Sequence, residues 1–312
     1  MFKNKEYVLA IVREGGFSKA AEKLYVSQPS LSATIKRIED KLSSPIFDRT
    51  TTPVSLTELG REYVRCAVEI EQREKDFELY ATERTNLTAG EIKIGASSLF
   101  SSFLLPTMIE AFNKEYPFVT VKIFENNTKN LLREMADGSL DIVIDNAVIN
   151  AENISSSVYS DETILLCVPN TFELDETLLS HSFSAEDVRE GRHLLAGHDV
   201  SLKAFGDLPF ILLNTENDTG KRALRLFKKH ELNPNVLFRL DQQITSYNIA
   251  SSGMGVCFVS DILVKNVFSS HSVRFFKLND PEINRRVYLY RKSNRYFSRA
   301  CQKFVEFNTG LG

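Results

Sequence analysis

The chain has 312 residues, of which 43% are hydrophobic and 25% are charged, and its formal net charge is −3 at pH 7. These proportions are ordinary for a globular protein, and the length exceeds that of one typical core, so two or more domains are expected. No stretch approaches the roughly 18 apolar residues that a membrane-spanning helix needs, which excludes a helical membrane protein.

The first predicted element is a helix over residues 4–14, because Tyr7, Ala10 and Ile11 recur on one helical face. The charged residues inside this segment distinguish it from the apolar core of a secretion signal. The protein is therefore expected in the cytoplasm.

Two short helices joined by a tight turn are predicted between Gly15 and Arg49. In the first, Ala20 and Leu24 lie four residues apart, and residues 25–27 form the turn that ends it. In the second, apolar residues recur at steps of four, three and four, which aligns them only on a helix. These residues are Leu31, Ile35, Ile38 and Leu42.

The second helix begins at Ser27, which is a good N-cap, and Pro29 is tolerated because it falls in the first turn. Two short helices across such a turn form a helix-turn-helix, whose second helix enters the major groove by its N-terminal end. Two short β-prone pieces follow, around residues 46–49 and 54–56, on either side of a polar tip at residues 50–53. They predict the wing of a winged helix-turn-helix.

A long helix is predicted from Thr57 to Leu87, and its narrow apolar stripe advances by alternating fours and threes. The stripe, which two arginines interrupt, consists of Leu59, Tyr63, Cys66, Ile70, Arg73, Phe77, Tyr80 and Arg84. Because one helix cannot bury such a stripe alone, we expect a partner helix from a second subunit to cover it. The alternative is that the stripe packs against its own domain.

From Glu91 onward, predicted strands and helices alternate, which indicates α/β wiring around a parallel sheet. The predicted strands cover residues 91–95, 120–124, 142–145, 163–168, 210–213, 236–240, 256–259, 273–276 and 287–290. The predicted helices cover residues 102–116, 128–137, 219–230, 242–252 and 296–307. Residues 170–208 show only scattered helical signals, and their role is left open.

Five blocks of sequence between Gly15 and Gly60 are more specific than a bare helix-turn-helix. They are Gly-Gly-Phe-Ser-Lys-Ala-Ala, Val-Ser-Gln-Pro-Ser-Leu-Ser, Ile-Lys-Arg-Ile-Glu, Pro-Ile-Phe-Asp-Arg and Ser-Leu-Thr-Glu-Leu-Gly. Their order closely resembles the N-terminal domain of LysR-type transcriptional regulators, and the resemblance continues more weakly through the whole chain. The alternative is a pair of amphipathic core helices with no role on DNA.

The resemblance implies a mostly α-helical winged helix-turn-helix over residues 1–58 and a linker helix for dimerisation over residues 59–88. Residues 89–312 would form an α/β effector-binding domain of two lobes, similar to a type II periplasmic binding protein. Lobe I would take about residues 91–165 and 270–312, and lobe II about residues 166–269. The family further implies a homodimer or homotetramer, with RNA polymerase as an additional partner.

Candidate residues for contacts with double-stranded DNA lie on the second helix and on the wing. Gln28, at the helix tip, can make a bidentate contact to adenine, whereas Lys36 and Arg37 suit phosphate. Many family members carry an arginine where this chain has Ala33 and a more basic wing, which suggests weaker operator binding here. The full set is Ser18, Ser27, Gln28, Pro29, Ser30, Ser32, Ala33, Thr34, Lys36, Arg37, Arg49, Thr50 and Thr51. A solvated polar face is the alternative.

The charge of the chain is unevenly distributed in a way that suits DNA binding at its N-terminal end. Up to Arg65 there are six Lys and five Arg against two Asp and six Glu, a net charge of +3 in a chain whose total is −3. Attraction to phosphate is local, so the acidic remainder would discourage indiscriminate binding elsewhere on the surface.

Candidate effector contacts follow the predicted strands, because α/β clefts collect ligands at the carboxyl ends of strands. Hydroxyl groups and free helix N–H groups at such positions could face an anion together, which favours a small polar or carboxylate effector. The residues are Ser97, Ser98, Phe100, Asn127, Thr128, Asn146, Asn214 and Thr215. Each polar member is equally well explained as a helix cap or turn residue.

No catalytic residue, cofactor or metal site is predicted. The sequence lacks Gly-x-Ser-x-Gly, His-Glu-x-x-His and a phosphate-binding loop, and His181, His193 and His198 lack metal-site spacing. The four cysteines lie far apart in the sequence and are expected to be buried free thiols. An effector-responsive, sequence-specific DNA-binding regulator is the main prediction. An effector-independent DNA-binding repressor, a solute-binding protein and an enzyme on the same two-lobed fold are the alternatives.

Overall fold

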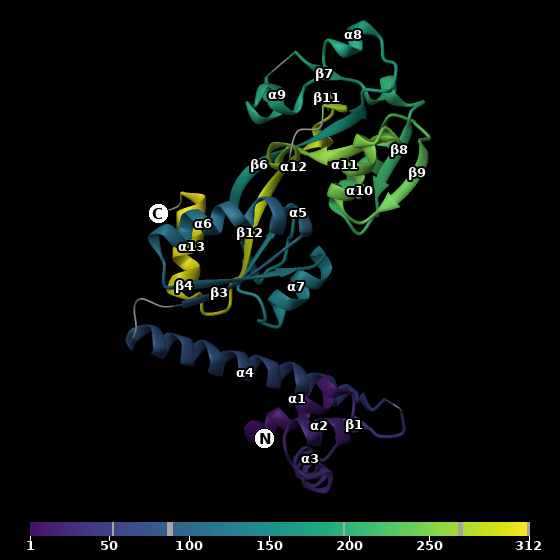
Figure 1. The fold of residues 1–312 in the computed structure, drawn as a ribbon. Coiled ribbons are helices and arrows are strands. Elements are labelled where there is room, and N and C mark those ends of the chain that lie inside the picture. Colours follow the sequence, from purple (N-terminus) through teal and green to yellow (C-terminus); the bar gives the residue numbers. More distant parts are fainter. Residues whose placement is uncertain (52, 86–89, 196, 268–270, 311–312) are drawn as a thin grey trace. The chain divides into compact units, whose positions relative to one another are not determined.

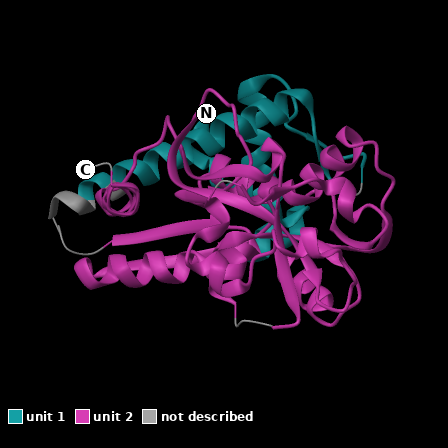
Figure 2. Cartoon of the chain, turned by 90° about the horizontal axis from the view of Figure 1, so that it is seen from above, with its two compact units in different colours: residues 1–85 teal, residues 86–312 magenta. Residues whose placement is uncertain are grey.

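The computed structural model describes residues 1–51, 53–85, 90–195, 197–267 and 271–310, and for residues 79 and 82–85 only the backbone (Figure 1). The chain divides into two compact units, Met1–Thr85 and Asn86–Gly312, which Figure 2 colours separately. Among the described residues, no helix combines the length and the apolar composition that crossing a membrane demands.

The first unit is a small helical domain with a two-stranded wing and one long helix. Its elements are η1 Phe2–Asn4, α1 Lys5–Glu14, α2 Phe17–Lys23, α3 Gln28–Leu42, β1 Phe47–Asp48, β2 Ser55–Leu56 and α4 Glu58–Thr85. The stripe predicted from the sequence forms the core, because Leu31, Ile35 and Ile38 on α3 are buried against Val8 and Ile11 of α1.

Local signals set the limits of α3 and of the wing. Ser27 caps α3 through its side chain, which accepts a hydrogen bond from the N–H of Ser30, and Pro29 lies in the first turn. The wing is the antiparallel pair of β1 with β2. Gly60 at the start of α4 must be glycine, because a Cβ there would collide with the carbonyl oxygen of Ile46.

The stripe predicted along the long helix is divided between two environments. Tyr63 and Ala67 are buried in the core of the first unit, and the Tyr63 ring stacks on Phe2. Ion pairs from Lys5 to Glu74 and from Arg13 to Glu71 also join α1 to α4. The domain core therefore takes one member of the predicted stripe, Tyr63, and this residue is not left for a partner helix.

The second unit consists of two α/β lobes. In lobe I the strand order is β4-β3-β5-β12-β6, and α5, α6 and α13 share its core. The elements are β3 Gly90–Ala96, α5 Ser98–Phe103, α6 Leu105–Glu115, β4 Val119–Glu125, α7 Thr128–Ala136, β5 Ile142–Asp145, β6 Ile154–Pro169, β12 Asn284–Lys292 and α13 Arg299–Thr309. The single helix predicted over residues 102–116 is divided into α5 and α6, because Pro106 must lie in a first turn.

Lobe II continues the same sheet from the second half of β6 through β10, β8 and β9, with β11 on the other side of β6. Its elements are α8 Glu176–Leu179, α9 Ala185–Arg189, η2 Arg192–Leu194, β7 Asp199–Val200, η3 Leu202–Phe205, β8 Pro209–Leu213, α10 Asp218–Lys229, β9 Asn235–Leu240, α11 Gln243–Ser251, β10 Val256–Ser260, α12 Asp261–Asn266, β11 Val273–Leu278 and η4 Pro281–Ile283. The segment at residues 170–208 is thus a set of short helices and one short strand.

Two chain crossings join the lobes; the first lies close to the predicted boundary near residue 165, and the second differs from the prediction. The first is β6, which pairs with β12 in lobe I and then with β10 and β11 in lobe II, so it is far longer than the predicted strand over residues 163–168 (Figure 1). The second lies between β11 and β12, because β11 belongs to lobe II. Lobe I therefore resumes near Asn284 rather than near residue 270. The β6–β12 and β6–β10 pairs are antiparallel, which makes the sheet mixed rather than parallel.

All four cysteines are free thiols, and Cys167, Cys257 and Cys301 are buried, whereas Cys66 on α4 is partly exposed. Cys167 and Cys257, although far apart in the sequence, face each other across β6 and β10. Burial raises the pKa of the Cys167 thiol well above its usual value, which disfavours the reactive thiolate.

Candidate functional sites

The N-terminal end of α3 presents an exposed polar surface. Ser27, Gln28, Pro29 and Ser30 are all exposed, and the Ser18 hydroxyl on α2 donates to the side-chain oxygen of Gln28 at 3.4 Å. Gln28 is thereby oriented by the helix that precedes it. A long amide side chain at an exposed helix tip has the shape and the donor–acceptor pair that reading adenine requires.

Farther along α3, the predicted DNA contacts separate by exposure. Ala33, Lys36 and Arg37 are exposed, and Ser32 is half-buried. Thr34 is only 8% exposed, and its hydroxyl donates to the Ser30 carbonyl oxygen at 3.0 Å, so it does not share the surface of Gln28. The prediction that Thr34 faces DNA is therefore at odds with its position.

The wing holds Arg49 in a defined orientation. Glu39 of α3 accepts hydrogen bonds from the N–H groups of Ile46 and Phe47 and pairs with Arg49 at 3.2 Å. The Arg49 guanidinium also stacks over Phe17, 5.0 Å from the ring centroid. The exposed residues Thr50 and Thr51 are tied into the turn by Asp48 and Ser55, whereas Thr52 lies outside the described residues. Arg49 thus stands beside α3 as a preorganised cation.

Four members of the predicted stripe, Cys66, Ile70, Arg73 and Phe77, line a shallow, mostly apolar groove on α4. Cys66, Ile70 and Phe77 form it together with Phe2, and Phe77 is 69% exposed. Leu59 is half-buried at the start of α4 and does not line the groove. An apolar side chain as exposed as Phe77 is a natural contact for another surface.

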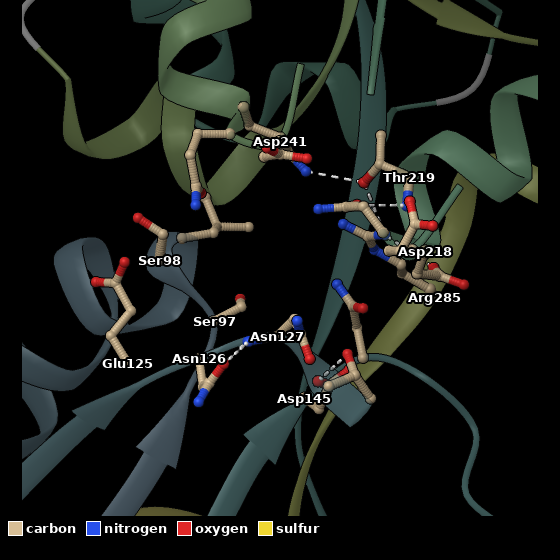
Figure 3. Close-up of a pocket in the computed structure, with 17 residues that line it drawn as sticks. Ser97, Ser98, Glu125, Asn126, Asn127, Asp145, Asp218, Thr219, Asp241 and Arg285 are labelled. Atoms are coloured by element: carbon tan, nitrogen blue, oxygen red, sulfur yellow. Dashed lines mark hydrogen bonds and ion pairs between the residues drawn. The ribbon is translucent and has the colours of Figure 1, made fainter. Parts of the chain in front are cut away.

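A polar cavity of about 430 Å³ lies between the two lobes of the second unit (Figure 3). It collects residues that follow the carboxyl ends of β3, β4 and β5 in lobe I and of β8 and β9 in lobe II. This is the position at which α/β sheets bind ligands, and the volume is within the usual range for small molecules. Gly220 permits the close approach of α10 to the end of β8, because a Cβ there would collide with the carbonyl oxygens of Leu213 and Asn214.

Arg285 forms part of the cavity wall and is held by a buried ionic network. Its guanidinium makes a two-point ion pair with Glu162, at 2.7 and 2.8 Å, and contacts Asp218 at 2.9 Å and the Thr219 hydroxyl at 3.0 Å. Asn146 donates to the same Glu162 carboxylate at 3.1 Å. The network joins residues of both lobes and gives the guanidinium four hydrogen bonds to protein groups.

Asp145, at the end of β5, is a second buried charge beside the cavity. It accepts hydrogen bonds from the Thr128 hydroxyl at 2.7 Å and from the N–H of Ala147 at 2.8 Å. Burial is the main reason that its pKa is raised above the usual range, and these bonds and the more distant Arg285 only partly offset it.

The cavity brings together most of the predicted effector contacts. Ser97, Ser98, Asn127, Thr128 and Asn146 all line it. The remaining three predicted contacts do not: Phe100, Asn214 and Thr215.

Each of the three non-lining residues has a different position. Phe100 is 1% exposed in the core of lobe I, where an aromatic ring is stabilised by packing. Asn214 donates to Asp241 at 2.7 Å and so orients a lining residue, and Thr215 is exposed outside the cavity.

None of the charged residues that line the cavity was predicted from the sequence. Asp145 and Asp241 could have been found, because each stands at the end of a predicted strand. Arg285 and Asp218 gave no local signal, since their side chains meet only through the topology of the sheet. The complete set of unpredicted lining residues is Leu99, Glu125, Asn126, Asp145, Glu216, Asn217, Asp218, Thr219, Asp241, Gln242, Gln243 and Arg285.

Other polar clusters in the second unit have structural explanations. His193 is fully buried, and its Nε2 lies 3.3 Å from Asp261, whose other oxygen accepts from the N–H of Thr163. His181 and His198 are in edge-to-face ring contact. Among the described residues, no group of His, Cys, Asp and Glu is arranged to hold a metal ion.

Comparison with known proteins gives matches over nearly the whole chain. Residues 2–61 match the model of the bacterial regulatory helix-turn-helix protein, lysR family, and residues 85–310 match that of the LysR substrate binding domain. The uncharacterized HTH-type transcriptional regulator YcgK of Bacillus subtilis is 27% identical over 305 residues, covering 97% of this chain and 92% of that protein.

Two full-length solved structures share the fold. A full-length OxyR variant from Pseudomonas aeruginosa superposes with a TM-score of 0.69 at 21% identity, covering 99% of this chain and 94% of that one. Full-length CbnR complexed with its target DNA gives a TM-score of 0.63 at 15% identity, covering 100% and 99%.

Proposed function

The chain belongs to the LysR family of transcriptional regulators, and we propose that it reads its operator with the N-terminal end of α3 and responds to a small molecule bound between its lobes. It is a DNA-binding regulator with an effector-binding domain, in a family of proteins that are not enzymes. The finer assignments below concern the residues, the oligomer and the regulation.

Operator reading is assigned to the exposed tip of α3. The exposed side chain of Gln28, which Ser18 orients, supports this assignment, and Ser27 and Ser30 lie beside it. Arg49, Lys36 and Arg37 would contact phosphate on either side of the reading residue. Thr34 is left out of this surface because it is buried.

The functional particle is proposed to be a homodimer or a homotetramer in the cytoplasm. The apolar groove with the exposed Phe77 on α4 supports association through this helix. Two reading helices at one operator would double the number of base contacts, as the two half-sites of helix-turn-helix dimers require. RNA polymerase is an additional partner in this proposal.

Effector control is assigned to the cavity between the lobes. A ligand that contacts both lobes stabilises one closure angle, and it can shift the equilibrium only by its difference in affinity for the two states. The competing function is repression without an effector, for which a polar cavity of this size would have no purpose.

The proposal is tested by a gel mobility shift on the promoter of the chain's own gene, followed by a thermal-shift screen of small metabolites. We expect a salt-sensitive, sequence-selective shift that one class of compound changes. Ser98→Trp would fill the cavity and should abolish the ligand response, whereas Ser102→Trp, on the exposed side of the same helix, should not. A response unchanged in Ser98→Trp would refute the cavity as the effector site, and no response from any compound would favour the effector-independent repressor.

A further inference from the structure

The cavity between the lobes is lined by more acidic side chains than basic ones. Five acidic side chains line it, from both lobes: Glu125, Asp145, Glu216, Asp218 and Asp241. Of these, only Asp218 has ion-pair partners among the described residues, in Arg222 and Arg285. The other four carboxylates therefore face the cavity without a matching positive charge.

Arg285 is the one basic residue among the described residues that line the cavity. Its Nε and Nη2 bond Glu162, and its Nη1 bonds Asp218 and Thr219. With four hydrogen bonds to protein groups and its charge shared between two carboxylates, this guanidinium is a poor anchor for an anionic ligand. The charges of the side chains that line the cavity therefore sum to a negative value.

Two of the hydroxyl and amide donors that the sequence offered to an anion are already engaged by protein carboxylates. The Thr128 hydroxyl donates to Asp145 at 2.7 Å, and the Asn146 side-chain amide donates to Glu162 at 3.1 Å. A carboxylate ligand would thus compete with protein carboxylates for these donors and would lie among several like charges.

Asn146 offers a hydrogen-bond acceptor to the cavity. It lines the cavity, is 8% exposed, and its Nδ2 donates to Glu162. Among the described residues, no donor bonds its Oδ1. Asn146 directly follows Asp145 in the chain and both residues line the cavity, so a ligand N–H group that binds here has an amide oxygen and a carboxylate from neighbouring residues as acceptors.

We propose that the effector is a small organic cation, carrying an ammonium or guanidinium group, rather than a carboxylate. The cation would lie against Asp145 and Asn146 in lobe I and reach Asp241 or Glu216 in lobe II, so that its charge draws the lobes together. The inference rests on the proposed function, because it assigns a chemical class to the same cavity. Ser97, Ser98 and Gln242 would serve neutral polar groups on the remainder of the ligand.

The charge requirement can be isolated with four compounds of equal chain length. They are 1,4-diaminobutane, 4-aminobutyrate, 1,4-butanediol and succinate, tested for stabilisation of the full-length protein at about 10 mM, which is tenfold above a Kd of about 1 mM. We expect stabilisation to decrease from the diamine to the amino acid and to be absent for succinate and the diol. A larger effect of succinate than of the diamine, or no effect of the diamine, overturns the proposal. A larger effect of 4-aminobutyrate assigns a zwitterion instead and also overturns it.

Two double variants distinguish binding of the diamine in the cavity from a general attraction of cations to an acidic protein. Glu125→Gln with Asp241→Asn removes one lining charge from each lobe, and should weaken diamine binding about tenfold or more. Glu152→Gln with Glu173→Gln changes the net charge equally at exposed positions outside the cavity, and should leave binding unchanged. Equal binding by both double variants would place the diamine elsewhere and refute the proposal.

Failure of this inference can be told from failure of the proposed function. If an anionic compound changes operator binding and Ser98→Trp abolishes that response, the cavity is the effector site and only the chemical class is wrong. If the diamine binds in the cavity but leaves operator binding unchanged, the class is correct and effector control is wrong.

Discussion

Arg285 and Glu162 are direct cross-strand partners in the β12–β6 pair and form a two-point ion pair that is almost completely buried. They lie one residue from the register pair of Asn284 with Thr163, beyond which β6 enters lobe II. The pair therefore stands where the lobes join and also carries the wall of the cavity. The same ion pair therefore stabilises the second unit and forms part of the ligand cavity.

Removing Arg285 should destabilise the second unit strongly. Arg285→Met leaves Glu162 as an uncompensated buried charge, which should cost about 3–5 kcal/mol of unfolding free energy. Arg286→Met is the control, because its ion pair with Asp161 is exposed and should contribute no more than about 1 kcal/mol. Both values can be measured by urea denaturation, and equal losses in the two variants would contradict the buried-pair interpretation. Replacing Glu162 as well should recover part of the loss.

Long periodic patterns predicted the helices well, and strands held only by pairing were predicted poorly. The stripe of α3 and its cap at Ser27 are local, so the sequence contains all that is needed. The first half of β6 contains four serines and has low intrinsic strand propensity. It is a strand because β12 supplies its hydrogen-bonding partner, and that pairing joins residues over a hundred positions apart.

The same division explains which cavity residues could be predicted. Ser97, Asn127 and Asn146 follow predicted strands, and the strand-end rule located them without a structure. The charge balance could not be derived in this way. It depends on Arg285 meeting Glu162 and Asp218, and no local pattern shows that this cation is already neutralised.

Base reading should depend on Gln28 alone among the long side chains at the tip of α3. Gln28→Ala should lose about 1–3 kcal/mol of discrimination at one base pair, because the bidentate amide contact is removed. Competition binding with single-base operator variants measures this loss. Uniform weakening on every sequence would mean that Gln28 contacts the backbone rather than a base.

Lys36 should behave in the opposite way, as a phosphate contact. Lys36→Ala should weaken binding to all sequences alike and reduce the slope of log affinity against log salt by about one unit. Fluorescence anisotropy over a salt series gives this slope. Thr34→Val should change neither quantity, because Thr34 is buried and bonded to the Ser30 carbonyl. If Lys36→Ala altered base preference instead, α3 would be rotated in the groove.

Association through α4 should fail when its exposed apolar groove becomes charged. Phe77→Asp should leave the first unit folded, because the side chain is 69% exposed, but should bury an unpaired charge in any helix–helix interface. Sedimentation should then show a smaller particle, together with weaker operator binding. Lys75→Asp, about half a turn away on α4, is the control and should retain the wild-type size. An unchanged particle in Phe77→Asp would show that another surface makes the oligomer.

Two buried aspartates should give stability profiles of opposite sign against pH. Burial raises the pKa of Asp145 above 3.8, whereas Asp261 has a lowered pKa. Burial is the largest influence on the pKa of Asp261 too, but the hydrogen bonds from His193, Lys265 and Thr163 and the charge of Lys265 together outweigh it. The stability that Asp145 contributes is present below pH 3.8 and is lost as the pH rises through its folded-state pKa. That of Asp261 is present above pH 3.8 and is lost as the pH falls through its folded-state pKa.

Asp145→Asn should therefore gain stability relative to the wild type as the pH rises from about 4 toward 8, because the amide has no charge to bury. Asp261→Asn should be destabilised throughout that range and approach the wild type only below about pH 4. The charged groups that face Asp145 across the cavity are Arg285 and the acidic residues Glu125, Glu216, Asp218 and Asp241. Melting temperatures at each pH measure both profiles. If the stability of the two variants changes in parallel with pH, other groups stabilise the Asp145 carboxylate in the folded protein. Asp145 would then not be an uncompensated buried charge in the cavity.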